Sequence, residues 1–510
     1  MNNRTSPWAA RLALVLVLAI ALAYAATLVR IVSAKWNNLD PALIDFGKVC
    51  QVLNGPFTRG VEYPDRVYYY TWAYAPFLLG LFPFFALFRS PLLLMVFQAL
   101  VFASCLPLLY LLARRYFQTL WPAIAFPLLF AMCPMVNLNA TVLFSGEKLF
   151  VPLLLLTVYL LETNRTRAAL LTAALSCVTK IQVLPVLLLF GFYHWRWQHH
   201  YFGRRLMKQT AFFLLAMLLG ALLVYAITGK PMRFSQLHLG QTTLNPLAYA
   251  QGTTSQILLF VQWAFLPFLA PEVLGWGLVD FAYLIVSWPT YTQIPDVRSL
   301  LTYSSLAAPL LHPAQTSLLA IYFLAFLVGT RRLVRWLSRR FGASAPTLEK
   351  ILVALLLPAG FAWYLLATPN QAGPFPLTVG GNPAFFTQTA RAAEGMALVQ
   401  SLPQRELGVT STVFFERAWA SAGARRIAPG ISFDEHYEYG LFDLYDRSGI
   451  MTPGEYVQQI VSVLNSDIFR VVYFHNGFLL LRKGPPDQHN QEAVQWILAH
   501  QNELLTPPSF

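Results

Sequence analysis

The sequence predicts an all-α polytopic membrane protein that carries a small α/β domain near its carboxyl end. Of its 510 residues, 56% are hydrophobic and only 12% are charged, about half the charged fraction typical of a soluble protein. Apolar runs recur between Leu12 and Leu366, and several reach the roughly 20 residues that cross a bilayer. After residue 383 the pattern changes to the mixed periods of a globular domain.

Basic residues predict the orientation of the chain. The 36 Lys and Arg outnumber the 23 Asp and Glu, which gives a net charge of +13. This excess argues against a nucleic-acid partner because it lies in short loops, as the positive-inside rule describes. We therefore expect a cytoplasmic amino terminus. The clusters are Arg4 and Arg11; Arg114 and Arg115; Arg165 and Arg167; Arg196, Arg204, Arg205 and Lys208; and Arg331, Arg332, Arg335, Arg339 and Arg340.

About eleven spans follow from these runs and clusters. The first run is too long for a signal peptide and has no small-residue cleavage site, so we expect it to be retained. The stretch 74–88 contains Pro76 and Pro83 and is expected to be a short helix at the membrane interface. The predicted spans are 12–32, 92–113, 121–138, 149–161, two short helices within 168–193, 210–228, 257–270, 273–288, 306–328 and 351–366.

Lys180 divides the run 168–193 into those two short helices. A single crossing would place the basic stretch "HWRWQHHYFGRRLMK" on the outer face, against the charge rule. Two half-length helices that meet at an outer turn satisfy the rule. The sequence therefore places Lys180 near the outer membrane surface.

The expected domain organisation is a transmembrane domain over 1–367, a Pro- and Gly-rich linker over 368–382, and an α/β domain over 383–510 on the outer side. Outer loops are expected at 34–90 and 139–148. Within the last domain, "ELGVTSTVFF" predicts a strand, and "FRVVYFHNGFLLLRK" predicts a hairpin that turns at Asn476-Gly477. Helices are expected from "FTQTARAAEGMALVQSL", "GEYVQQIVSVLNS" and "QEAVQWILAHQNELL".

Familiar motifs of soluble enzymes are missing from the sequence. The four cysteines suggest no disulfide framework, and no His/Cys spacing predicts a metal site. A Walker A loop, a dinucleotide-binding glycine motif and a nucleophile elbow are likewise absent. Any chemistry would then depend on carboxylates and basic groups at the membrane surface. The sequence neither requires nor excludes a bound divalent cation as cofactor.

Four segments carry a family resemblance: "LIDFGKVCQVLNG", "YAPFLLGLFPFFALFRSPLLLMVFQALVFASCLPLLYLLARRYF", "LFSGEKLFVPLLLL" and "VTKIQVLPVLLLF". Their order and spacing resemble an uncharacterised bacterial family of polytopic membrane proteins. That family is distantly similar to the GT-C glycosyltransferases, which take sugars from polyprenyl phosphates. The resemblance is closest over 44–195 and weaker beyond. It implies a GT-C-like fold in the bacterial inner membrane, with the last domain in the periplasm.

The implied function is transfer of a sugar from a polyprenyl-phosphate-linked donor to a glycan or lipid acceptor of the envelope. In the GT-C pattern a carboxylate in the first outer loop acts as general base, and Asp45 occupies that position. The residues that could bind substrate are Lys48, Arg59, Glu62, Asp65, Arg66, Glu147, Lys148 and Lys180. Each has a simpler interpretation: Asp45 as a loop acid paired with Lys48, and Glu147 and Lys148 as a loop end. Lys180 could be a snorkelling lysine. Glu62 and Asp65 could be interfacial charges that accompany Arg59 and Arg66.

The sequence departs from the family pattern at two histidine positions. Ala73 precedes "YAPF" where the family tends to have histidine, and Ser145 follows Phe144 where it tends to have another. These departures keep a second hypothesis open: a non-catalytic membrane protein that binds lipid or glycan, transports, or assists assembly. Asp280 lies within an apolar run, and an acid in a membrane segment suggests function by default.

Overall fold

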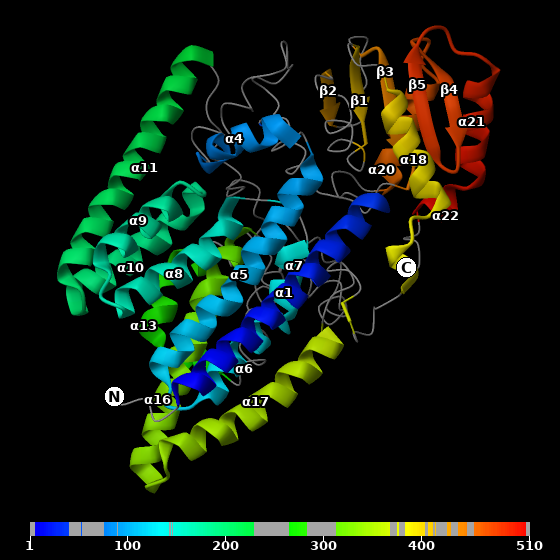
Figure 1. The fold of residues 1–510 in the computed structure, drawn as a ribbon. Coiled ribbons are helices and arrows are strands. Elements are labelled where there is room, and N and C mark those ends of the chain that lie inside the picture. Colours follow the sequence, from blue (N-terminus) through cyan, green and yellow to red (C-terminus); the bar gives the residue numbers. More distant parts are fainter. Residues whose placement is uncertain are drawn as a thin grey trace. The chain divides into compact units, whose positions relative to one another are not determined.

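The protein is described here from a computed structural model, shown as a ribbon in Figure 1. The structure describes residues 6–39, 53, 76–88, 90–141, 144, 146–228, 265–282, 313–367, 375–376, 383–402, 406–411, 414, 426–429, 437–445 and 453–505.

The chain divides into two units. We call residues 1–31, 72–77 and 96–382 the membrane unit, and residues 32–71, 78–95 and 383–510 the sheet unit. The boundary in the carboxyl-terminal half falls between Asn382 and Pro383. Among the described residues, three helices begin in one unit and end in the other: α1 (Pro7–Asn37), α4 (Phe77–Phe88) and α5 (Pro91–Tyr116).

The membrane unit is built of helices. Among the described residues, four helices are long and apolar enough to cross a membrane: α1, α5, α16 (Pro313–Phe341) and α17 (Ala345–Ala367). A fifth span is possible if α6 (Leu120–Ala131) and α7 (Pro134–Thr141), which meet at a bend of 53°, are taken together. The apolar helices confirm a membrane protein. The larger count of about eleven spans stays a prediction.

Shorter helices fill the rest of the described membrane unit. They are η3 (Gly146–Leu149), α8 (Phe150–Glu162), α9 (Thr166–Cys177), η4 (Ile181–Val183), α10 (Leu184–Trp197), α11 (His200–Thr228), η5 (Leu266–Leu269), α13 (Pro271–Leu274) and η6 (Gly275–Gly277). Helix α4 (Phe77–Phe88) has 12 residues with Pro83 inside it. At 1.5 Å per residue it spans about 18 Å, less than the hydrocarbon core of a bilayer, as expected for residues 74–88.

The apolar run around Lys180 is broken as predicted. Helix α9 ends at Cys177, Lys180 has an extended backbone, and η4 leads into α10. Two short helices of 12 and 14 residues therefore replace one long span. The expected outer loop 139–148, in contrast, contains the buried end of α7 and the buried helix η3.

Helix α16 forms the centre of the membrane unit. Every residue from Leu318 to Leu327 is buried, which is typical of a helix surrounded by others. It packs against α8, α13, α17 and the short helices η3, η5 and η6. Aromatic pairs add α6 to these neighbours, since Phe323 and Phe326 contact Phe130 and Phe126.

Within its described residues, the sheet unit contains five strands in the order β2-β1-β3-β5-β4. They are β1 (Leu407–Thr410), β2 (Arg426–Pro429), β3 (Tyr439–Asp443), β4 (Phe469–His475) and β5 (Phe478–Lys483). Strand β1 pairs in parallel with β2 and β3, whereas β3, β5 and β4 pair antiparallel. The predicted α/β domain is confirmed, although the sequence showed neither β2 nor β3.

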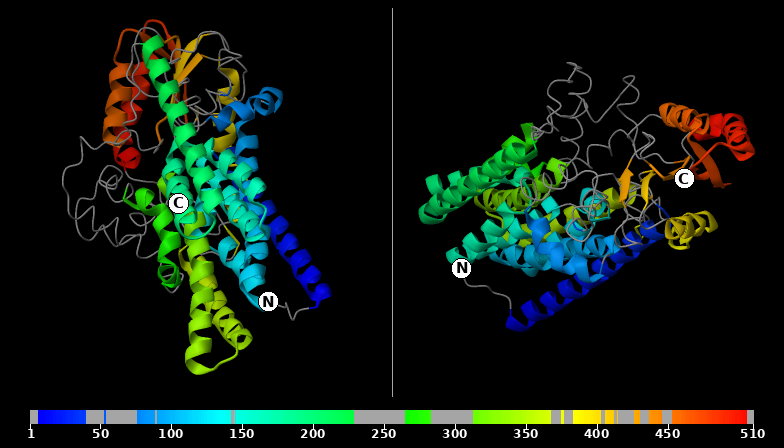
Figure 2. Two further views of the ribbon diagram at one scale, coloured as in Figure 1. Left: turned by 90° about the vertical axis from the view of Figure 1, so that its left-hand side faces the viewer. Right: turned by 90° about the horizontal axis from the view of Figure 1, so that it is seen from above.

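Helices cover both faces of this sheet (Figure 2, right). On one face α18 (Ala390–Ser401) approaches so closely that a Cβ on Gly395 would meet Phe414 and Phe478. On the other face α20 (Pro453–Leu464), α21 (Gln488–Ala499) and α22 (Gln501–Leu505) close the core. The buried side chains of that core include Phe442, Leu444, Tyr456, Ile460, Phe469, Leu479, Leu481, Ala493 and Ile497.

The predicted hairpin turn is confirmed at Asn476 and Gly477. Both residues have positive φ, 49° and 75°, as a two-residue type I′ turn requires. A Cβ at Gly477 would also lie 2.4 Å from the Tyr445 ring. Glycine is therefore needed there for both backbone conformation and space.

The end of α1 belongs to the sheet unit and is bonded to the start of α18. The Asn38 side chain donates to Phe385 O at 2.6 Å and accepts from Thr389 N at 3.1 Å. Gln388 donates to Asn37 O at 3.2 Å. Thr389 caps α18 by accepting from Ala392 N. Three polar contacts thus join the end of the amino-terminal helix to the segment that leads into α18.

Candidate functional site

A buried ion pair lies in the membrane unit. Lys180 Nζ is 3.0 Å from Glu147 Oε2, and their side chains are 9% and 4% exposed. Ionised groups are expensive in a membrane interior unless paired, so their presence there indicates a function or a fixed structural role. The separation of 3.0 Å is that of a direct ion pair.

Local backbone geometry presents both side chains. Lys180 follows the end of α9, where Thr179 donates to Ser176 O and the chain turns into η4. The carbonyl of Val178 in this turn accepts from Phe77 N at 2.9 Å. The start of α4, within the motif "YAPF", is thereby joined to the turn that carries Lys180. Glu147 comes from η3, where Lys148 follows it directly in sequence.

Lys148 adds a second buried cation. It is 5% exposed and follows Glu147 directly in η3. The structure pairs Glu147 with Lys180, a partner 33 positions along the chain. Two lysines and one carboxylate are thus buried at η3 and in the turn after α9. Lysine ammonium groups commonly bind phosphate.

A layer of buried amides lies in α7, close in sequence to η3. Asn137 Oδ1 accepts from Tyr24 of α1 at 2.8 Å. Gln98 of α5 donates to the carbonyls of Asn139 and Ala140 at 3.2 and 3.1 Å. Thr316 of α16 donates to Asn139 Oδ1 at 2.7 Å. Sequence reasoning missed this layer, although "NLNAT" within an apolar run was its signal.

Asp280 is buried in the same unit. It is 4% exposed and accepts a hydrogen bond from Ser317 of α16. Ser317 is adjacent to Thr316, which binds Asn139. Two neighbouring hydroxyl groups of α16 therefore donate hydrogen bonds to two different buried side chains, Thr316 to Asn139 and Ser317 to Asp280. This satisfied bond supports a structural role for Asp280.

The remaining predicted residues lie outside the described residues. Their positions relative to Glu147 and Lys180 stay predictions. They are Asp45, Lys48, Arg59, Glu62, Asp65 and Arg66. Among the described residues, no group of three His, Cys, Asp or Glu side chains is arranged to hold a metal ion.

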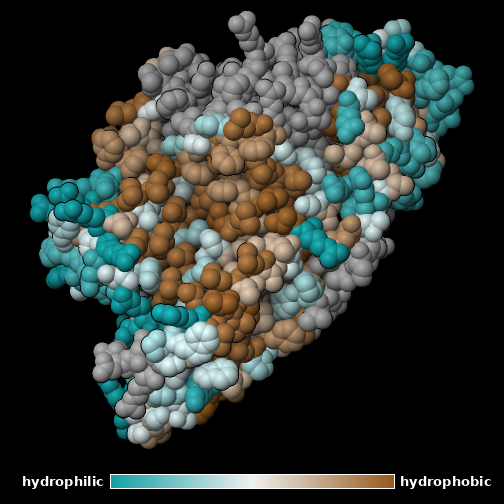
Figure 3. Space-filling model, in the orientation of Figure 1, coloured by the Kyte–Doolittle hydropathy of each residue, from teal (hydrophilic) through white to brown (hydrophobic). Residues whose placement is uncertain are grey.

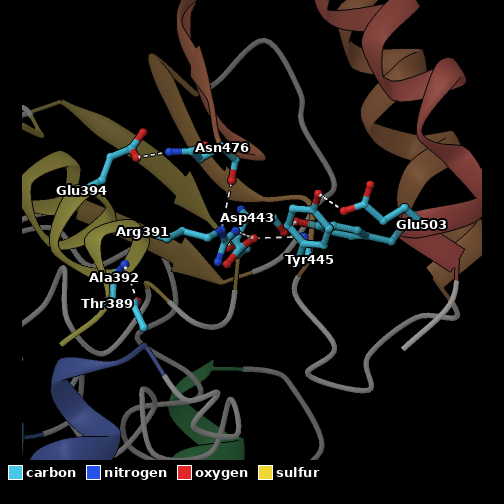
Figure 4. A network of polar contacts seen from close by, with 10 residues as sticks. Thr389, Arg391, Ala392, Glu394, Asp443, Tyr445, Asn476 and Glu503 are labelled. Carbon is cyan, nitrogen blue, oxygen red and sulfur yellow. Dashed lines mark hydrogen bonds and ion pairs between the residues drawn. The ribbon is translucent and has the colours of Figure 1, made fainter. Parts of the chain in front are cut away.

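A second polar network lies in the sheet unit, on the face covered by α18 (Figure 4). Arg391 forms an ion pair with the buried Asp443 at the end of β3 and donates to Asn476 O at 3.0 Å. Its guanidinium lies over the Phe478 and Tyr445 rings at 4.1 and 5.0 Å. All these contacts satisfy Arg391 internally. We infer that this network has a structural role: it holds α18 against the sheet.

Glu394 is the second anchor of that helix. It accepts hydrogen bonds from Tyr473, from Asn476 at 2.7 Å and from His475 at 2.8 Å. Burial alone would raise the pKa of Glu394, but the hydrogen bonds from Tyr473, Asn476 and His475 outweigh it and lower the pKa. The same contact with Glu394 raises the pKa of Tyr473 to about 12.

We expect Glu394 to make the sheet unit sensitive to acid. A carboxyl whose pKa is lowered by folding contributes stability that is present above its unfolded pKa and is lost as the pH falls through the folded value. Between about pH 5 and pH 3 the β4–β5 hairpin should therefore lose amide protection against hydrogen exchange. Glu394→Gln should remove this pH dependence, whereas Glu492→Gln on exposed α21 should keep it. Identical pH profiles for the parent and Glu394→Gln would contradict the assignment.

Comparison with solved structures identifies the fold. The crystal structure of ArnT from Cupriavidus metallidurans bound to undecaprenyl phosphate matches with a TM-score of 0.50 and 15% sequence identity. The match covers 92% of this chain and 97% of that one. No protein-family model and no curated protein sequence matches the chain. The GT-C-like membrane fold expected from the sequence is thereby confirmed.

Proposed function

We propose that this protein is a membrane glycosyltransferase that takes a sugar from a polyprenyl-phosphate carrier and transfers it to an envelope acceptor. The observation that carries the proposal is the buried pair of Glu147 and Lys180, with Lys148 beside it, within a fold shared with ArnT. The ArnT crystal structure contains undecaprenyl phosphate. The ammonium groups of Lys148 and Lys180 are suited to binding a lipid phosphate.

The proposed chemistry divides between a base and the cations. Asp45 takes the proton from an acceptor hydroxyl, whose oxygen attacks the anomeric carbon of the sugar. The bond between that carbon and the phosphate oxygen breaks, and the electron pair leaves with polyprenyl phosphate. Lys180 and Lys148 stabilise the charge that develops on this phosphate. Further contacts with donor and acceptor are proposed for Lys48, Arg59, Glu62, Asp65 and Arg66.

Two observations favour the non-catalytic alternative. Glu147 already neutralises Lys180, and Ser145 stands where the resembling family tends to have histidine. A protein that only binds lipid or glycan would need neither a base nor a proton donor. Binding of donor without transfer is the result that this alternative predicts.

Donor turnover distinguishes the two functions. The purified full-length protein in nanodiscs receives a panel of radiolabelled polyprenyl-phosphate sugars together with an envelope lipid and glycan extract. Release of polyprenyl phosphate that depends on both protein and extract supports transfer. Saturable donor binding without release across the whole panel would overturn the enzyme and favour the binding protein.

We further propose that the sheet unit lies on the periplasmic side of the inner membrane. The basic clusters place the amino terminus and the end of α16 in the cytoplasm. In a cysteine-free background, a cysteine at exposed Ser401 should react with a membrane-impermeant maleimide in intact cells. A cysteine in place of exposed Arg340 should react only after the cells are opened. The reverse pattern would contradict the orientation.

A further inference from the structure

The helical hairpin formed by α10 and α11 ends in a basic and aromatic surface. Its exposed residues come from the last turn of α10 and the first turns of α11. We call this set the basic hairpin end; its members are Arg196, Trp197, Tyr201, Arg204, Arg205 and Lys208. Trp197 and Tyr201 are 62% and 58% exposed, which is unusual for aromatic residues unless they meet a membrane interface or a partner.

The sequence leaves these cations without nearby acids. No Asp or Glu occurs between Glu162 and Glu272. Within the described residues no ion pair involves Arg196, Arg204, Arg205 or Lys208, whereas Arg332 at the end of another span pairs with Glu272 at 2.6 Å. Uncompensated charge gathered at one point favours an external anion.

Two short backbone approaches hold the hairpin end in a fixed shape. A Cβ on Gly203 would lie 2.0 Å from Trp195 N and 2.5 Å from Gly191 O. The start of α11 can therefore pack directly on α10 only because residue 203 is glycine. The Arg205 guanidinium lies 4.8 Å from the Tyr201 ring, and that of Arg196 lies 6.0 Å from Trp197. Cations and aromatic rings are thus presented together on a rigid support.

One face of α11 changes from basic to apolar along its length. Tyr201, Arg204 and Lys208 are followed at helical spacing by exposed apolar residues, which are 55–66% exposed: Phe212, Leu215, Leu219 and Leu222. On the face drawn in Figure 3, hydrophilic residues gather at the end where α10 meets α11, next to a hydrophobic surface. The basic part from Tyr201 to Lys208 measures about 10 Å, comparable to the roughly 5–8 Å headgroup layer on one side of a bilayer.

We propose that the basic hairpin end binds anionic phospholipids of the cytoplasmic leaflet. The apolar continuation of the same helix face lies in hydrocarbon, so the ligand of the cations must lie at headgroup depth. A phospholipid with net negative charge meets both requirements, because its phosphate reaches the arginines while its acyl chains cover the leucines. A nucleic acid or an acidic protein would contact only the first two turns of α11.

The test uses two photoactivatable lipids with the same acyl chains, a phosphatidylglycerol and a phosphatidylcholine. In nanodiscs, the phosphatidylglycerol probe should label the peptide that contains residues 195–212. The triple variant R204Q/R205Q/K208Q should reduce this labelling by about 10-fold or more. The matched triple variant R335Q/R339Q/R340Q, at the end of α16, should leave it unchanged. Equal labelling by both probes, or equal loss in both triple variants, would overturn the proposal.

Three further measurements keep the test decisive if the triple variant folds poorly. In the unaltered protein, raising NaCl from about 0.1 to 0.5 M should lower phosphatidylglycerol labelling, because salt screens exposed charges. The conservative R204K/R205K variant should retain labelling, since lysine keeps the charge. Free inorganic phosphate at millimolar concentration should not compete. Full competition by phosphate would assign the surface to soluble anions and reject the lipid.

Discussion

Replacing Asp45 by Asn is expected to lower sugar transfer by about 10²–10⁴-fold. The amide keeps the size and polarity of the side chain but cannot take the proton from the acceptor hydroxyl. Donor binding should change little, because the cations proposed to hold the phosphate are untouched. The measurement is release of polyprenyl phosphate from a radiolabelled donor by protein in nanodiscs, together with the affinity for the donor. A loss in rate without a loss in affinity identifies a base.

Asp40→Asn provides the matched control, because it makes the same chemical change five positions earlier. This variant should keep the parent rate. An equal loss in both variants would point to the charge of the segment in place of a specific proton acceptor. Full activity in Asp45→Asn would remove Asp45 as the base and direct attention to Glu62, Asp65 and Glu147.

Local sequence patterns predicted most of the described elements. The hairpin at Asn476-Gly477 was evident because only a few residue types accept positive φ at both turn positions. The break at Lys180 was evident because a charge within an apolar run conflicts with a single span. Strands β2 and β3 were missed for a different reason: they have four and five residues, too few for a period to emerge.

Partners within the candidate site were harder to predict. Glu147 and Lys180 were both selected as substrate-binding candidates, but the sequence could not show that they pair, since 33 residues and helices α8 and α9 separate them. The bend between α6 and α7 was missed as well, because the run 121–138 reads as one apolar span. That bend accompanies the buried amides Asn137 and Asn139, which bond to three other helices.

Breaking the pair of Glu147 and Lys180 should have the largest effect on stability. Glu147→Gln leaves Lys180 buried without its carboxylate, and removal of one partner of a buried pair typically costs about 3–5 kcal/mol of unfolding free energy. Lys180→Met should cost about as much. The double variant should recover most of the loss, because it removes both charges. Thermal unfolding of the detergent-solubilised protein measures all three.

The pair of Arg332 and Glu272 is the control for this cycle. Its side chains are 47% and 23% exposed, and pairs at such sites contribute about 0–1 kcal/mol. Glu272→Gln should therefore change the unfolding temperature only slightly. A loss as large as that of Glu147→Gln would show that burial is not the source of the effect at Glu147.

Addition of undecaprenyl phosphate separates a ligand site from a purely structural pair. Lys180→Met removes a charge-assisted contact with the phosphate and should weaken binding by about 1.5–3 kcal/mol, or about 10- to 150-fold. Glu147→Gln should bind at least as well as the parent, since Lys180 then has no competing carboxylate. The lipid should accordingly restore much of the stability of Glu147→Gln and little of that of Lys180→Met. If the lipid stabilises both variants equally, Lys180 does not contact the phosphate, and the pair serves only to hold η3 against the turn after α9.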